Sequence, residues 1–117
     1  GFGLLGTLMQ MCECSGVHAL VDRGRVPLLD GVEHYLDLGC APGGSQRNYD
    51  SYGQCLAAMT ERDIQIFLDP QTSGGLLVSV RPEAEPEFLA TAAEQGLELK
   101  AFGELIPSDE GPRIRFC

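Results

Sequence analysis

Glycine and proline divide this chain into short segments, which limits it to small regular elements. The 117 residues include 15 glycines and seven prolines. Apolar residues at spacings of three and four predict a helix over Leu4–Cys12, which Gly16 ends because glycine adopts left-handed backbone at little cost. Alternation predicts a strand over Val17–Val21. Gly39 and Gly96 would end two further helices, over 30–38 with an Asp30 cap and over 83–95.

The remaining segments complete a mixed set of elements. A helix over 54–68, with a break near Thr60, must stop before Asp69-Pro70, because the residue before proline disfavours helical backbone. Strands are predicted over Leu76–Val80, Leu97–Glu104 and Arg113–Phe116. Residues 40–53 are polar and glycine-rich, which predicts a loop. We therefore expect one domain over 1–117, of class α+β, with a small mixed β-sheet packed against helices.

Composition narrows the possible partners and compartments. Seventeen acidic against eight basic residues give a net charge of −9, which disfavours binding to nucleic acid. No apolar run approaches the ~18 residues that a membrane span requires. Five cysteines form no evident disulfide framework, so we expect reduced thiols and a cytoplasmic location.

Metal-ligand patterns are weak. Cys12 and Cys14 form a Cys-x-Cys pair, but tetrahedral zinc needs four ligands and no second pair exists. His18 and His34 lie on predicted elements without a cysteine or serine partner nearby in sequence, which favours structural or surface roles. The sequence therefore predicts no metal site and no catalytic residue.

The first six residues match the dinucleotide fingerprint G-x-G-x-x-G, and Asp22 stands near the expected distance for a ribose ligand. That fingerprint requires a strand leading into the glycine turn, and no residues precede Gly1 to form one. The alternative, which we prefer, is that these glycines let backbones pack closely. Because the first residue is not methionine, we expect the chain to be a fragment of a longer protein or a processed product.

Two polar, glycine-containing stretches are the candidate functional segments. Asp69–Gly75 lies between two apolar runs, and its glycine amides and hydroxyl groups suit an anion or a carbonyl. A tight turn capped by Asp69 is the competing interpretation. In Pro42–Asn48, Arg47 either binds a phosphate or ties the loop to a carboxylate. The candidate site residues are Arg47, Asn48, Gln71, Thr72, Ser73, Gly74 and Gly75.

Three motifs in one order carry a family resemblance: Gly1–Gly6, Pro42-Gly43-Gly44 with Arg47-Asn48, and Asp69–Leu77. Together they resemble the C-terminal domain of the selenide, water dikinases (selenophosphate synthetases). This family belongs to the aminoimidazole ribonucleotide synthetase-like superfamily, in which an N-terminal ATP-binding domain pairs with a C-terminal α/β domain. The resemblance extends from Gly1 to about Leu105.

The resemblance implies a parent enzyme that converts ATP, selenide and water, with Mg²⁺, into selenophosphate, AMP and phosphate. It implies that the catalytic and most metal-binding residues lie in the N-terminal ATP-binding domain, and that the parent is a homodimer. This chain would then form one wall of the active-site cleft and be inactive alone. Thr7 stands where the family usually has His, and Ser45 where it usually has Thr. The alternative is a non-catalytic dimerisation or partner-docking module of a related ATP-dependent enzyme.

Overall fold

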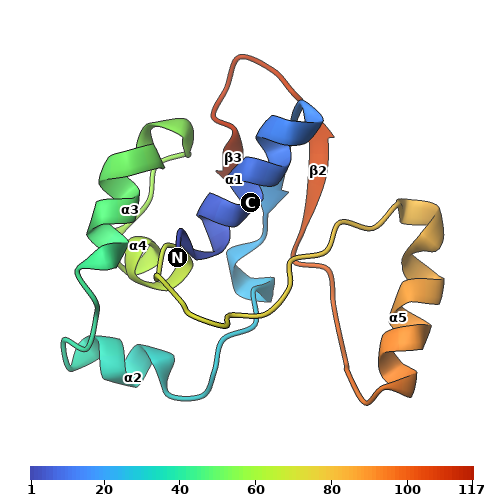
Figure 1. The fold of residues 1–117 in the computed structure, drawn as a ribbon, viewed down its shortest axis with the longest axis horizontal. Helices are drawn as coiled ribbons and strands as arrows, with labels where there is room; N and C mark the ends of the chain where they lie inside the picture. The colour runs from blue at the N-terminus through green and yellow to red at the C-terminus, as the bar shows by residue number, and fades with distance from the viewer.

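The computed structural model describes residues 1–117 and has five α-helices around a three-stranded mixed sheet (Figure 1). This architecture is the expected α+β class. The helices are α1 (Gly3–Ser15), α2 (Val32–Asp37), α3 (Gly44–Tyr52), α4 (Glu61–Phe67) and α5 (Glu85–Glu94). The strands are β1 (Val17–Val21), β2 (Gly103–Pro107) and β3 (Ile114–Phe116). Short 3-10 turns are η1 (Arg23–Arg25), η2 (Gly53–Cys55) and η3 (Pro82–Ala84).

The sheet has the order β2-β1-β3, with β1 in the centre. β1 pairs antiparallel with β2, so that Ala19 faces Leu105, and parallel with β3, so that Ala19 also faces Ile114. Helix α1 precedes β1 through Gly16, whose φ of 65° is the predicted left-handed helix end. The predicted helix and strand at the start of the chain are therefore confirmed.

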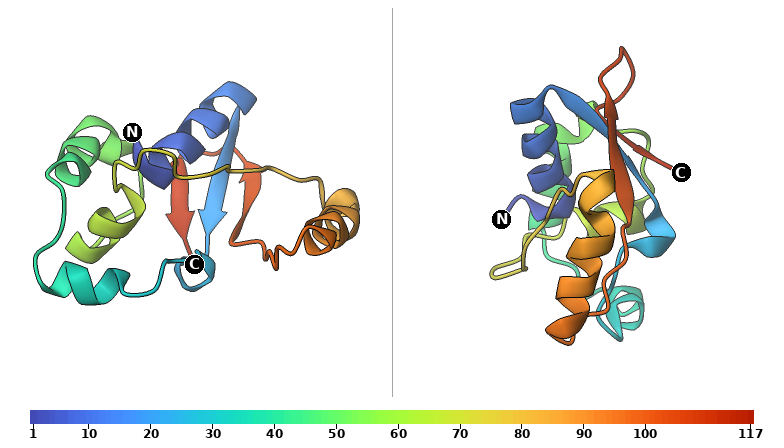
Figure 2. Two further views of the ribbon diagram at one scale, coloured as in Figure 1. Left: turned by 60° about the horizontal axis from the view of Figure 1, so that its bottom comes forward. Right: turned by 90° about the vertical axis from the view of Figure 1, so that its right-hand side faces the viewer.

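The core lies between α1 and the sheet. Figure 2 shows α1 lying along one face of the sheet. Leu5 and Ile114 are fully buried, and Cys12, Ala19 and Val21 are nearly so. Leu68, at the end of α4, is also fully buried and joins this cluster. No helix has the length and apolar character needed to cross a membrane.

Helix α5 stands apart from this core, as Figure 1 shows. Its main contacts are with η3, the turn that directly precedes it. On this helix only Ala92 is buried, while Phe88 and Leu89 are half-buried. The radius of gyration is 14.8 Å, against about 13.4 Å expected for a compact domain of this length. The projecting helix accounts for this expansion.

The two segments that connect α5 to the body differ from prediction. Within this chain the strand predicted over Leu76–Val80 is wrong, because this segment pairs with no other strand. The strand predicted over Leu97–Glu104 begins only at Gly103, where the chain reaches β1. Both segments have strand-like sequences, but a strand forms only where a partner supplies hydrogen bonds.

The loop predicted over 40–53 is also wrong, since residues 44–52 form α3. Its buried residues are small or aromatic, namely Gly44, Ser45 and Tyr52, so the usual leucine periodicity is absent. Gln46 donates a hydrogen bond to Asp50, one helical turn later, at 3.0 Å. This helix is held in place by close packing of small residues rather than by an aliphatic stripe.

Helix α4 is shorter than predicted. Thr60 and Asp63 form a reciprocal capping box, in which each side chain accepts a hydrogen bond from the other's backbone amide at 3.1 Å. The predicted break near Thr60 is thus the start of the helix, and the residues before it form η2 and an extended connection. Asp30 does not cap α2, because the N-cap position of this helix is occupied by Gly31, which has left-handed backbone.

The turn between β2 and β3 is held by the carboxylate of Asp109. This carboxylate forms an ion pair with Arg115, accepts a hydrogen bond from the Gly111 amide at 2.8 Å and lies 3.4 Å from Nδ1 of His18. The Arg115 hydrogen bond, and then that of Gly111, lower the pKa of Asp109 below its ordinary value of 3.8. His18 is buried beside it on β1.

A lowered carboxyl pKa in the folded state stabilises the fold at pH values above the unfolded pKa. The contribution is lost as the pH falls through the folded pKa. We therefore expect Asp109→Asn to unfold more easily than the wild type near neutral pH, with the difference shrinking below pH 3.8. Urea unfolding across this pH range measures it. Asp30→Asn, at an exposed carboxylate without an ion pair, is the control.

Candidate functional site

The three motifs singled out in the sequence meet at the start of α1. The side-chain amide of Asn48, on α3, donates to the carbonyl of Gly1 at 3.2 Å and to that of Leu68 at 2.8 Å. Gly44, at the start of α3, packs against Pro70, since a Cβ there would lie 2.6 Å from the proline ring. Segments far apart in sequence are thus joined at one corner of the molecule.

The glycines at the start of the chain serve this junction. A Cβ on Gly1 would lie 2.8 Å from the carbonyl oxygen of Gln71, and one on Gly3 would lie 2.7 Å from the backbone of Leu68. Gly6 packs against Tyr52 in the same way. Protein backbone therefore fills the space that a pyrophosphate would need. The geometry favours close packing over a dinucleotide site.

Tyr52, on α3, makes a further contact at this junction. Its hydroxyl donates a hydrogen bond to the carbonyl of Phe2. Burial raises the pKa of Tyr52 to about 12, so the phenol remains a donor at neutral pH. The sequence pattern gave no sign of this contact, because 50 residues separate the two partners.

The Asp69–Gly75 loop lies on the surface beside this junction. Gln71, Thr72, Ser73, Gly74 and Gly75 are all exposed. Their amides form no hydrogen bond within the chain, apart from that of Gln71, which donates to the Asp69 carbonyl at 3.0 Å. The hydroxyls of Thr72 and Ser73 are likewise without a partner in the chain. The loop therefore presents free polar donors to its surroundings.

The conformation of this loop requires unusual backbone angles. Ser73 has a φ of 60°, which is uncommon outside glycine, and Gly75 has a φ of 105°. Gly74 leaves room for the Gln71 side chain, whose Oε1 would lie 2.6 Å from a Cβ at that position. A turn with positive φ at Ser73 and Gly75 is thus present together with the exposed donors, but no hydrogen bond to the Asp69 side chain caps it.

Arg47 is the one cationic residue within the three sequence motifs. Its side chain is exposed and forms no ion pair, and one guanidinium nitrogen would lie 3.7 Å from a Cβ on Gly43. Five arginines are paired with carboxylates: Arg23, Arg25, Arg62, Arg113 and Arg115. Arg47 is therefore free to bind an anion, whereas Asn48 is already engaged by two backbone carbonyls.

No group of three or more His, Cys, Asp or Glu side chains is placed to hold a metal ion. Cys12 is buried, and burial raises the pKa of its thiol, whereas Cys14 is exposed. His34 is exposed and packs edge-on against Tyr35. The cysteine pair and the two histidines thus lie apart from the candidate loop.

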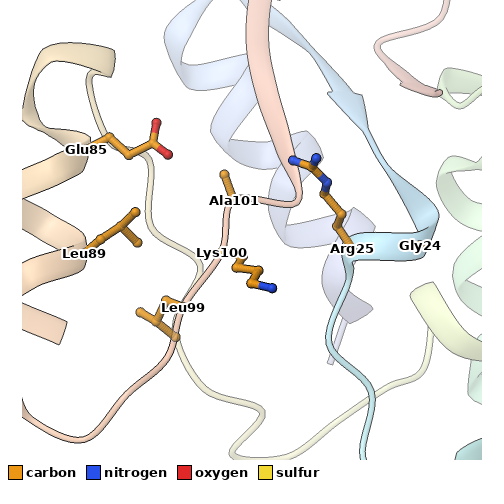
Figure 3. A pocket seen from close by; sticks show the side chains of 7 residues that line it. All are labelled: Gly24, Arg25, Glu85, Leu89, Leu99, Lys100 and Ala101. Carbon is orange, nitrogen blue, oxygen red and sulfur yellow. The ribbon is translucent and has the colours of Figure 1, made fainter. Parts of the chain in front are cut away.

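Two cavities lie elsewhere, beside α5. One of about 510 Å³ is shown in Figure 3, with Glu85 and Leu89 of α5 on one side and Arg25 on the other. A second, of about 440 Å³, lies between α5 and the segment Val78–Arg81. Neither is lined by a predicted site residue.

This α+β domain matches, over residues 1–114, the family described as AIR synthase related protein, C-terminal domain. The match spans nearly the whole chain, so the chain belongs to that family. Within it, the chain is similar to proteins named selenide, water dikinase.

The similarity to these relatives is high over almost all of this chain. It is 54% identical over 111 residues to the selenide, water dikinase of Escherichia coli strain K12, which is 95% of this chain and 32% of the relative. It is 55% identical over 106 residues to that of Bordetella bronchiseptica strain RB50, or 91% of this chain and 31% of the relative. The chain spans about a third of the length of these relatives.

Proposed function

We propose that this chain is the C-terminal part of a selenide, water dikinase and forms one wall of its active-site cleft. The longer parent would convert ATP, selenide and water into selenophosphate, AMP and phosphate. It would be a homodimer in the cytoplasm, with the catalytic groups in an N-terminal ATP-binding domain. The chain alone would lack activity.

The observation that carries this proposal is the convergence of the three family motifs on one surface. The Asn48 hydrogen bonds and the Gly44–Pro70 contact hold the Asp69–Gly75 loop beside the first residue of the chain. The loop keeps the amides of residues 72–75 and both of its hydroxyls free, and Arg47 has no carboxylate partner. Free donors and an unpaired guanidinium suit the oxyanions of a phosphorylated substrate.

The residues present fit the two implied ligands differently. Arg47, Thr72 and Ser73 would bind and orient oxygen atoms of ATP or of its products. Mg²⁺ requires carboxylates that converge on one point, and this chain has no such group. The metal would therefore be held by residues outside this chain, and we assign it no step here.

Arg47→Ala in the longer parent protein tests this role. We expect selenide-dependent AMP formation to fall about tenfold or more, because one charge-assisted hydrogen bond to the substrate is lost. Arg25→Ala is the control, since it removes an exposed arginine that lies outside the three motifs and pairs with Asp22 at 3.4 Å. Equal activities in the two variants would exclude Arg47 from the site.

A docking role is the second candidate, favoured by the apolar surface around α5. Leu76 is 94% exposed and Leu97 is 54% exposed, which is more than a folded chain usually leaves to water. A non-catalytic module would use this surface and leave the Asp69–Gly75 loop unused. Loop variants with unchanged activity in the parent would favour this candidate.

A further inference from the structure

The segment Leu76–Val80 has the properties of a β-strand without a partner. None of its backbone amides or carbonyls forms a hydrogen bond within the chain. Leu77 packs against the core, while Leu76 and Val78, on the opposite side, are 94% and 52% exposed. A strand with apolar residues on both faces is typical of a sheet that is covered on both sides. The face of this segment that carries Leu76 and Val78 is therefore left exposed to water.

Helix α5 shows the same lack of cover. A cavity of about 440 Å³ separates it from the segment Val78–Arg81, with Phe88 on its wall. The cavity of about 510 Å³ lies between α5 and η1, and exposes Leu89 and Leu99 (Figure 3). Both hollows are open to solvent, so the apolar side chains that line them stay partly in water.

A second copy of this chain is a poor candidate for that cover. The surface around α5 carries a concentration of carboxylates: Glu83, Glu85, Glu87, Glu94 and Glu98. Each copy also has a net charge of −9. Bringing two such surfaces together places like charges side by side, which opposes association.

The start of the chain points to a different occupant. Gly1 lies against Gln71, since a Cβ on Gly1 would be 2.8 Å from the Gln71 carbonyl oxygen. Residues that precede Gly1 in a longer protein therefore emerge next to the loop that leads into Leu76. An extended chain advances about 3.3 Å per residue, so about ten residues can run along the whole unpaired segment.

We propose that Leu76–Val80 is a strand of a larger sheet and pairs with a strand formed by residues preceding Gly1 in the longer protein. This inference rests on the proposed function only in that the chain is part of a longer protein. The relatives, about three times as long, provide the necessary chain. The upstream strand supplies the missing hydrogen bonds, and its neighbouring residues cover Leu76, Val78 and the inner face of α5.

Hydrogen–deuterium exchange of the longer protein, followed by mass spectrometry, tests the pairing. We expect amides of Leu76–Val80 to exchange about 100-fold more slowly in the longer protein than in this chain alone. The protection should not change on dilution. Protection that disappears on dilution would assign the strand to a second copy, and rapid exchange at all concentrations would show that no strand forms; either result overturns the proposal.

A proline variant provides an independent measurement. Val78→Pro removes one strand amide and should lower the melting temperature of the longer protein while leaving that of this chain unchanged. Leu29→Pro is the control, at an exposed loop residue whose amide forms no hydrogen bond. Equal effects of the two variants on the longer protein would contradict the pairing. Neither readout uses enzyme activity, so the pairing can fail while the proposed reaction stands, and the reverse.

Discussion

Replacing Gly3 by alanine is expected to lower the free energy of unfolding by about 3 kcal/mol or more. Gly3 has a φ of 78°, and an added Cβ would lie 2.7 Å from both the Cα and the carbonyl carbon of Leu68. The clash is with backbone, so no side-chain rotation relieves it. Leu68 is fully buried, and shifting it would disturb the core as well as the junction.

Gly16→Ala is the matched control for this prediction. Gly16 has a similar φ of 65°, but no atom lies within 4 Å of a Cβ at that position. Alanine at this position lowers the free energy of unfolding only through its left-handed backbone, which costs about 1–2 kcal/mol. Comparing the urea unfolding of the two variants separates the cost of left-handed backbone, which both share, from the cost of the contact with Leu68, which only Gly3→Ala has. Equal losses of stability would show that the backbones at Gly3 and Leu68 are not in contact.

Asn48→Ala is expected to lower the free energy of unfolding by about 2 kcal/mol. The change removes hydrogen bonds to two carbonyls, those of Gly1 and Leu68, at 3.2 and 2.8 Å. The Leu68 carbonyl belongs to a fully buried residue, so it would lose a partner that water replaces poorly. Thermal or urea unfolding measures the effect.

The control for Asn48 lies on the same helix. Gln46→Ala removes one exposed hydrogen bond, to Asp50 at 3.0 Å, and should cost less than about 0.5 kcal/mol. A double variant of Asn48 and Gly3 should lose less than the sum of the single effects, because both disrupt the same junction. Full additivity would show that the two residues act in separate places.

Local signals in the sequence were sufficient for the elements that depend on local interactions. The leucine periodicity of α1, the left-handed Gly16 and the alternation in β1 are all present in the structure. The break at Thr60 also had a local cause, since a capping box involves residues only three apart. These features are determined within about one turn of chain.

Elements that depend on distant partners were not predictable in the same way. The helix α3 has no aliphatic stripe, because its buried face consists of small residues and a tyrosine that contacts α1. The segment Leu76–Val80 has a strand sequence, yet pairing requires an edge that this chain does not supply. A sequence pattern indicates which residues tend to be buried and which secondary structure they favour. It does not indicate whether a neighbouring strand is present to pair with them.

The candidate site was predictable as a set of motifs but not as an arrangement. Exposure of Gln71, Thr72 and Ser73 follows from their polarity and the adjacent glycines. That Asn48 serves the junction depends on its hydrogen bonds to Leu68 and Gly1, which lie 20 and 47 positions away in the sequence, and no local pattern shows that Arg47 lacks a carboxylate partner. Such contacts are decided by the tertiary fold.

The proposed function makes one claim about the Asp69–Gly75 loop, namely that its exposed donors face the substrate in the longer protein. Amide exchange of that protein, measured with and without ATP and selenide, tests it directly. We predict that the amides of Thr72, Ser73, Gly74 and Gly75 exchange more slowly when the substrates are bound. Unchanged exchange in this loop, while other parts of the protein become protected by ATP, would contradict the claim.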